Sequence, residues 1–220
     1  MAGKARWVDL AQEFYEGMPR GHVLPPPTVR TLKQVGRDPF NIMEYTTCTH
    51  IGTHLDAPMH FQPGGQTIEQ LPLERLVGEA AVVSMKKGRV EPITIKDLEG
   101  ATPQVRDGEM VLFHTGWGAK WGTDEYHEHP YLADELVDWL VARKVPLIGV
   151  DFVTPDLPFQ LRKPGFTYPI HRGLLPRGIL IIENLNLEAV AGQRVILHAF
   201  PVKIRGGDGA PVRVVARVDA

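Results

Sequence analysis

Four potential metal ligands lie close together in the segment Thr46–Phe61, and they restrict the local backbone more than any other feature of the chain. His50, His54, Asp56 and His60 fall within eleven residues. Imidazole nitrogens and carboxylate oxygens are the ligands that suit zinc, manganese or iron. The number of ligands and their even spacing predict a divalent metal site in this segment.

The same segment is expected to curl. Gly52, Pro58 and the β-branched threonines before them disfavour a helix, whereas an extended chain would point positions 50, 52, 54 and 56 to one side. A straight strand rises about 3.3 Å per residue, which would separate the Cα atoms of His50 and Asp56 by roughly 20 Å. We therefore expect the backbone to bend at Gly52 and regular pairing to end at Pro58.

The segment His50-Ile-Gly-Thr-His54-Leu-Asp56-Ala-Pro58-Met-His60 resembles the signature of the metal-dependent cyclase or kynurenine formamidase family, His-x-Gly-Thr-His-x-Asp-x-Pro-x-His. Four other segments are also similar to that family: Thr115-Gly116-Trp117, Gly149-Val150-Asp151, His171-Arg172-Gly-Leu-Leu and Ile181-Ile182-Glu183-Asn184-Leu185. The resemblance runs over most of the chain. It implies one cyclase-family hydrolase domain over residues 1–220, of the swivelling β/β/α type.

The hydrophobic pattern independently favours an α/β fold, and the resemblance implies that its core is a central mixed β-sheet or barrel-like sheet flanked by helices. Apolar residues recur at helical spacing over Tyr131–Lys144, and continuous apolar runs at Leu147–Val150 and Gly178–Ile182 predict buried strands. Helices that alternate with buried strands are typical of α/β proteins. Alternating residues around the turn Gly206–Gly209 predict a C-terminal hairpin that serves as scaffold or subunit contact.

The resemblance also implies a second group of ligands. His171 and Glu183 would complete it, and Asp56 would bridge to the first group, which contains His50 and His54. The implied cofactor is a divalent metal, Zn or Mn, with two ions per subunit. The sequence does not choose between these metals, because the same ligand types serve both.

Two acidic residues receive no role from the sequence. Asp151 ends a predicted strand, and Asp156 lies in Thr154-Pro155-Asp156 where the family usually has Ser-x-Asp.

His60 is the predicted proton carrier. A metal ion lowers the pKa of bound water toward about 7, and imidazole titrates close to working pH. Trp117 and Trp121 follow the predicted strand Met110–His114 in a glycine-rich loop. Aromatic side chains beside a cleft could hold a planar substrate, and packing against the core is the alternative for both tryptophans.

The function implied by the resemblance is metal-dependent amide hydrolysis of the arylformamidase type. The family substrate is N-formylkynurenine, which is cleaved to kynurenine and formate in tryptophan catabolism. Opening of a lactam, a cyclic imide such as isatin, or a lactone is an alternative within the same chemistry. A metal-dependent binding protein without turnover is the alternative from another class. Many family members carry Met-Pro-x-Trp-Pro-Gly-Asp where this chain has Met18-Pro19-Arg20-Gly21, so the substrate carries over less firmly than the chemistry.

Composition excludes several other classes of function. The net charge is −2 with both signs interspersed, which gives no basic patch and argues against nucleic acid as a partner. No phosphate-binding loop, dinucleotide fingerprint or nucleophile elbow occurs, so the chemistry falls to the metal. No apolar run has the length of a membrane span, and one cysteine permits no internal disulfide, so we expect a cytoplasmic protein acting on a small molecule. The resemblance further implies a homodimer.

Overall fold

A nine-stranded mixed sheet runs through the computed structural model, which describes residues 5–219. Its strand order is β1-β13-β11-β5-β7-β9-β10-β4-β12. The strands of this sheet are β1 (Arg6–Asp9), β4 (His54–Asp56), β5 (Val77–Ser84), β7 (Met110–His114), β9 (Leu147–Val150), β10 (Leu180–Glu183), β11 (Arg194–His198), β12 (Gly209–Pro211) and β13 (Val215–Val218). Two small sheets pair β2 (Thr28–Lys33) with β3 (Ile42–Thr46) and β6 (Pro92–Ile93) with β8 (Tyr131–Leu132).

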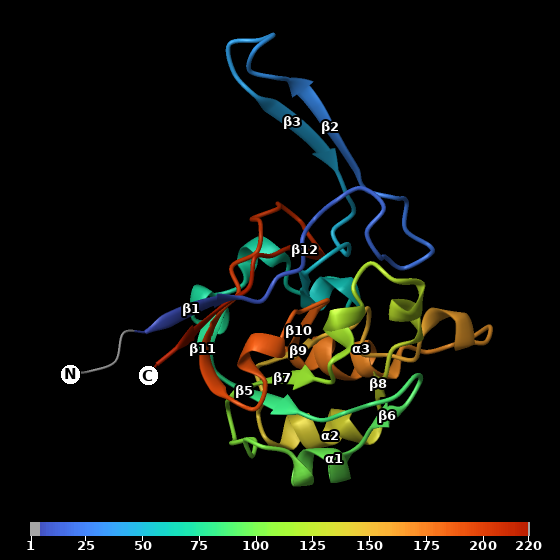
Figure 1. Cartoon of the computed structure of the whole chain (residues 1–220). Helices are drawn as coiled ribbons and strands as arrows, with labels where there is room; N and C mark the ends of the chain where they lie inside the picture. The colour runs from blue at the N-terminus through green and yellow to red at the C-terminus, as the bar shows by residue number, and fades with distance from the viewer. Residues whose placement is uncertain (1–4, 220) are drawn as a thin grey trace.

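The centre of the large sheet is parallel and its two sides are antiparallel. Strands β5, β7, β9 and β10 run parallel, whereas β4 and β12 extend one side and β11, β13 and β1 the other in antiparallel pairing. The sheet curls into a half-barrel, as Figure 1 shows. The predicted α/β fold with a mixed, barrel-like sheet is therefore confirmed.

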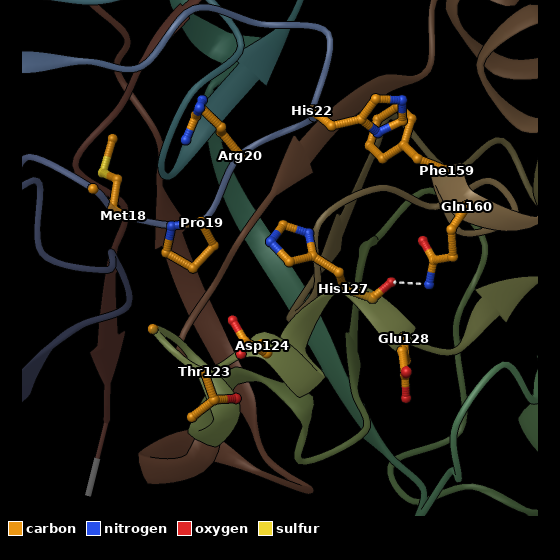
Figure 2. Close-up of a pocket in the computed structure, with 12 residues that line it drawn as sticks. Met18, Pro19, Arg20, His22, Thr123, Asp124, His127, Glu128, Phe159 and Gln160 are labelled. Atoms are coloured by element: carbon orange, nitrogen blue, oxygen red, sulfur yellow. Dashed lines mark hydrogen bonds between the residues drawn. The ribbon is translucent and has the colours of Figure 1, made fainter.

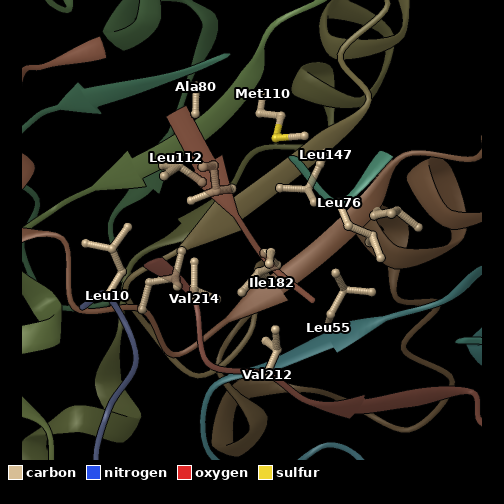
Figure 3. Close-up of a cluster of buried hydrophobic side chains, with 14 of the residues drawn as sticks. Leu10, Leu55, Leu76, Ala80, Met110, Leu112, Leu147, Ile182, Val212 and Val214 are labelled. Atoms are coloured by element: carbon tan, nitrogen blue, oxygen red, sulfur yellow. The ribbon is translucent and has the colours of Figure 1, made fainter. Parts of the chain in front are cut away.

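Alternate residues of the parallel strands supply two separate apolar cores, because both faces of the sheet are covered. On one face, Ala80 and Leu112 belong to the same apolar cluster as Leu10 and Val214 (Figure 3). On the other face, the intervening residues of β5 and β7 pack under three short helices. The helices are α1 (Ile95–Gly100), α2 (Glu135–Ala142) and α3 (Pro169–Leu174). Within residues 5–219, no helix has the length and apolar character that a membrane span requires.

Two predicted elements differ from the structure. The helix predicted over Tyr131–Lys144 begins only at Glu135, because the backbone N–H groups of residues 131–133 donate to carbonyls of other segments and hold them extended. The predicted C-terminal hairpin forms only as a single antiparallel bridge, between Pro201 and Val212, whereas β12 pairs with β4 and β13 pairs with β1 and β11. Alternation placed Val212 and Val214 correctly on the inside, but it could not indicate which strand each segment would join.

A two-stranded hairpin, β2 and β3, projects away from the body of the protein (Figure 1). The first strand of this hairpin, β2, follows the run Pro25-Pro26-Pro27. Met43 and Tyr45 on this hairpin are 61% and 60% exposed, which is high for side chains of this size.

Candidate metal centre

The two innermost motif residues lie on the short strand β4. His54 and Asp56 share one face because side chains alternate along a strand. Residue Glu183 on β10 lies opposite His54 in the antiparallel register, so its carboxylate reaches the same face. His171 comes from α3, which begins after Tyr168 in a left-handed conformation. Strand pairing therefore joins residues that are far apart in the sequence.

The backbone bends where the sequence predicted. Gly52 has φ +69°, a conformation that favours glycine, and the chain turns there between His50 and β4. Pro58 opens a single 3-10 turn (Pro58–His60) directly after β4, which ends strand pairing and brings His60 to the site. The neighbouring strand also leaves room for the His50 ring, because a Cβ on Gly209 would lie 2.6 Å from its Cε1 atom.

Two carboxylates lie between His54 and His171, the two most deeply buried histidines of the site. The Nε2 atom of His54 is 3.4 Å from Asp56 Oδ1 and 3.3 Å from Glu183 Oε2. On the other side, His171 Nε2 is 3.5 Å from Asp56 Oδ2 and 3.3 Å from Glu183 Oε1. Ligand atoms on one tetrahedral zinc, with bonds of about 2.1 Å, are separated by roughly 3.4 Å. Each histidine with its two carboxylate oxygens therefore has the spacing of a coordination shell.

Unsatisfied polar atoms converge at the same point. His54 Nε2, Asp56 Oδ2 and Glu183 Oε1 are buried and have no hydrogen-bond partner among the described residues. Buried polar atoms are rarely left unpaired, since the loss of hydration costs about 1–3 kcal/mol for each. The donor set of nitrogen and carboxylate oxygen, together with these orphaned atoms, fits a divalent ion.

The remaining ring nitrogens of these histidines fix the direction of the rings. His54 Nδ1 donates to the Gly52 carbonyl at 2.8 Å, and His171 Nδ1 donates to Asp156 Oδ2 at 2.5 Å. Both bonds leave Nε2 as the free acceptor, which is the arrangement typical of metal-ligating histidines. Asp156 therefore has a role that the sequence did not assign.

Asp151 lies elsewhere, and it accepts hydrogen bonds from the backbone of Thr115 and Gly116 at 2.9 Å each.

His50 is placed differently from the other predicted ligands. Its Nδ1 lies 2.7 Å from Asp56 Oδ1 and its Nε2 2.9 Å from Asp208 Oδ2. Because both nitrogens face carboxylates, His50 can hold an ion only by exchanging one of these contacts. The ring stacks on that of His60 with centroids 3.8 Å apart, and His60 Nδ1 lies 3.3 Å from Asp208 Oδ2.

Asp208 is the residue of this site that sequence reasoning missed. It comes from the turn that was interpreted as part of a hairpin, 158 residues after His50. The only signal was a carboxylate in the glycine-rich run Gly206-Gly207-Asp208-Gly209. Neighbouring histidines hold the pKa of Asp208 below its usual range, first through the hydrogen bond from His50.

The pKa values show how strongly the carboxylates attract positive charge. Burial alone lowers the pKa of His54, but Asp56 and Glu183 raise it to about 10. Likewise, burial opposes protonation of His171, and its carboxylate neighbours nevertheless raise its pKa well above the usual value. His60 differs, because burial and the two adjacent histidines lower its pKa. His60 is therefore the histidine of the group whose pKa lies below its usual value.

All six sequence-predicted ligand and catalytic residues line one cavity of about 220 Å³. They are His50, His54, Asp56, His60, His171 and Glu183. The two tryptophans do not line it: Trp117 is buried and donates from Nε1 to the Tyr126 carbonyl, and Trp121 packs edge-on against the Tyr126 ring. Trp117 is therefore part of the apolar core, and Trp121 is partly buried against it.

Comparison with known proteins places this chain in a family. The model of the Cyclase family, described as "Putative cyclase", matches residues 8–157, and the chain belongs to that family. Its curated relatives include the kynurenine formamidase of Salinibacter ruber, 37% identical over 180 residues and covering 80% of each chain. The kynurenine formamidase of Geobacillus thermodenitrificans is 31% identical over 216 residues, covering 96% of this chain and 97% of the relative.

Solved structures of related proteins have the same fold. Isatin hydrolase A from Ralstonia solanacearum superposes with a TM-score of 0.86 at 25% identity, covering 97% of this chain and 92% of that chain. A structure described as a potential metal-dependent hydrolase with cyclase activity has a TM-score of 0.79 at 26% identity, covering 97% and 98%. The family resemblance predicted from the sequence is thus confirmed, and the relatives are hydrolases.

Proposed function

We propose that this protein is a metal-dependent amidohydrolase that cleaves the C–N bond of an aryl formamide, with N-formylkynurenine as the substrate. The observation that carries the proposal is the group of buried, unpartnered ligand atoms from His54, Asp56 and Glu183 in one cavity with His60. The kynurenine formamidases among its relatives supply the reaction. Hydrolysis would yield kynurenine and formate.

The proposed ligands are His50, His54, Asp56, His171 and Glu183. A divalent ion held there would lower the pKa of a bound water toward about 7 and polarise the substrate carbonyl. His60 Nδ1 faces Asp208, which leaves Nε2 to take a proton and return it to the leaving nitrogen. Asp208 orients the His60 ring for this transfer.

Two ions of Zn or Mn per subunit are the proposed cofactor. Two sets of ligand-like contacts, one at His54 and one at His171, support a pair of ions. Asp56 and Glu183 each have one carboxylate oxygen near His54 and the other near His171. Metal analysis of protein reconstituted with zinc or with manganese tests this proposal. A ratio of two ions per chain is expected, and a ratio of one with full activity would contradict it.

Hydrolysis of N-formyl-L-kynurenine is the direct test of the function. Metal-loaded protein is expected to form kynurenine rapidly, and a chelator-treated sample is expected to lose this activity and to recover it when metal is restored. Turnover that persists after complete removal of metal would refute the metal dependence. A fully loaded sample that hydrolyses no carbonyl substrate would favour a binding protein without turnover.

Ring opening of a cyclic amide is the second candidate function. The similarity of the whole fold to isatin hydrolase A favours it. Isatin, a lactam and a lactone should therefore be assayed beside the formamide. A value of kcat/KM at least tenfold higher on a cyclic substrate would transfer the proposal to ring opening and leave the site assignment unchanged.

Replacement of His60 tests its proposed role in proton transfer. The variant His60→Ala is expected to retain its metal but to lose at least about a hundredfold in turnover, the usual size of general acid–base catalysis. His198→Ala is the control, because His198 packs against Trp7 on β1. Unchanged turnover in His60→Ala would remove this residue from the mechanism.

A homodimer is the proposed assembly. The projecting hairpin carries exposed Met43 and Tyr45, which are apolar enough to contact a second subunit. Sedimentation equilibrium should give twice the mass of the chain, and a monomer would refute the proposal. The predicted cytoplasmic location can be tested by cell fractionation.

A further inference from the structure

The guanidinium of Arg162 is held rigidly by the segment that follows Asp156. Its Nε donates to the Leu157 carbonyl at 2.7 Å. The guanidinium carbon lies 3.9 Å from the ring centroid of Phe159, 5.1 Å from that of Phe166 and 4.9 Å from that of Tyr168. Three aromatic contacts and a backbone bond leave this side chain little freedom, so its position is prepared before any ligand binds.

The charge of Arg162 is only partly balanced by the carboxylates near it, Asp156 and Glu183. Over residues 5–219, no carboxylate forms a salt bridge with it, in contrast to the buried histidines nearby. Its Nη2 is buried and has no hydrogen-bond partner in this part of the chain. A buried donor without an acceptor is costly, and the cost is larger when the group is charged. An anionic group of a bound ligand would therefore supply the hydrogen-bond acceptor that this guanidinium lacks.

Arg162 lines the cavity that contains the proposed metal ligands. His54 and Glu183 line the same cavity, and the aromatic rings of Phe61 and Tyr168 form part of its wall. Among the described lining residues, Arg162 is the only arginine or lysine. The cavity thus combines the proposed metal ligands, aromatic rings and one cation without a salt-bridge partner in the described chain.

We propose that Arg162 selects substrates that carry a carboxylate, and that it holds this carboxylate while the scissile amide lies against the metal ligands. A planar guanidinium presents paired N–H donors that match a carboxylate, and Arg162 has the free, buried Nη2 that such a pair requires. The inference rests on the proposed amide hydrolysis and narrows its substrate class to acidic aryl amides. Arg162 is then the specificity determinant of the site.

A second arginine provides a matched control. Phe159 separates the metal cavity from a larger cavity of about 730 Å³, which Figure 2 shows with Arg20, His22 and His127 on its walls. Arg20 resembles Arg162 in that its Nε donates to a backbone carbonyl, that of Leu24, at 3.0 Å. Both arginines are partly buried, but Arg20 does not line the metal cavity.

The kinetic test uses the metal-loaded enzyme and two substrates. One is N-formyl-L-kynurenine, and the other is the analogue in which an uncharged carboxamide replaces its carboxylate. Arg162→Gln is expected to lower kcat/KM for the acid by about 10- to 100-fold, the size of a hydrogen bond to a charged group, and for the carboxamide by less than about threefold. Arg162→Lys should recover part of the loss, because it keeps the charge without the paired donors. Arg20→Gln should leave both substrates unchanged. Equal losses on both substrates in Arg162→Gln, or a selective loss in Arg20→Gln, would overturn the proposal.

A binding measurement separates this proposal from the proposed function. L-Kynurenine and its carboxamide are titrated into metal-free wild type and Arg162→Gln, so that neither turnover nor an ion contributes. Wild type is expected to bind the acid about 10-fold or more tightly than the carboxamide, and Arg162→Gln is expected to bind both equally. Wild type without this preference overturns the role of Arg162. Absence of formamide turnover with the preference intact would instead refute the formamidase function alone.

Discussion

Replacing Asp156 by asparagine should weaken metal binding, although Asp156 is not itself one of the proposed ligands. Asp156 accepts three hydrogen bonds: from the His171 ring at 2.5 Å, from the Ile170 backbone at 2.9 Å and from the His171 backbone at 3.4 Å. Asparagine has the same shape, but its amide group would point N–H bonds at one of these donors. The His171 ring would then lose the partner that keeps its proton on Nδ1, away from the metal side.

The expected size of the effect follows from the general role of such partners. Loss of a hydrogen bond that orients a metal-bound histidine typically costs 10- to 100-fold in metal affinity, or about 1.4–2.7 kcal/mol. Calorimetric titration of metal-free protein with zinc should show this loss for the ion at His171 only. Weakening of the ion at His54 should be much smaller, because the orienting acceptor of that ring is the Gly52 carbonyl.

Asp151→Asn is the control for buried charge. Asp151 is also buried and accepts backbone hydrogen bonds, but its partners are Thr115 and Gly116. This variant should lower the free energy of unfolding and leave the zinc affinity unchanged. The reasoning is refuted if Asp156→Asn folds normally and binds zinc as tightly as wild type, or if both variants weaken it equally.

Three further predictions concern stability and proton transfer. Gly149→Ala should lower the free energy of unfolding by about 1–3 kcal/mol in urea titrations, because its Cβ would lie 2.6 and 2.7 Å from two leucine side chains. Gly100→Ala is the control and should be tolerated, because no atom lies within 4 Å of its Cβ. Burial lowers the pKa of His129 to about 4, below its unfolded value near 6.5. The contribution of neutral His129 to the free energy of unfolding is therefore complete above pH 6.5 and should decline by up to about 3 kcal/mol as the pH falls toward 4. A His129→Gln variant whose free energy of unfolding depends on acid pH as that of wild type does would disprove this. Asp208→Asn should reduce kcat by about tenfold at unchanged metal content, and wild-type kinetics would show that His60 needs no such orientation.

The sequence predicted those parts of the fold that depend on local pattern. The strand Leu147–Val150 has the predicted bounds, since a continuous apolar run between a helix and a carboxylate leaves little choice. The bend at Gly52 also followed from spacing alone, because a straight chain could not gather the ligands. These features need only neighbouring residues for their explanation.

Features that depend on distant partners were missed. Asp208 reaches His50 only because β12 pairs with β4, and no periodicity near residue 208 reports that pairing. Asp156 acquires its role from a histidine 15 residues later in the chain. The projecting hairpin β2–β3 lacks a buried face in the described chain, so its sequence shows no inward alternation.

The pairing of β12 with β4 has a consequence for the order in which the protein matures. Residues near Asp56 leave the ribosome long before Asp208 and Gly209, so the nascent chain exposes a histidine-rich segment that lacks its last strand partner. Synthesis proceeds at about 5–20 residues per second, which leaves this segment incomplete for roughly 8–30 seconds. Premature metal capture by that segment would compete with correct folding, and high free zinc during expression should therefore lower the yield of native enzyme.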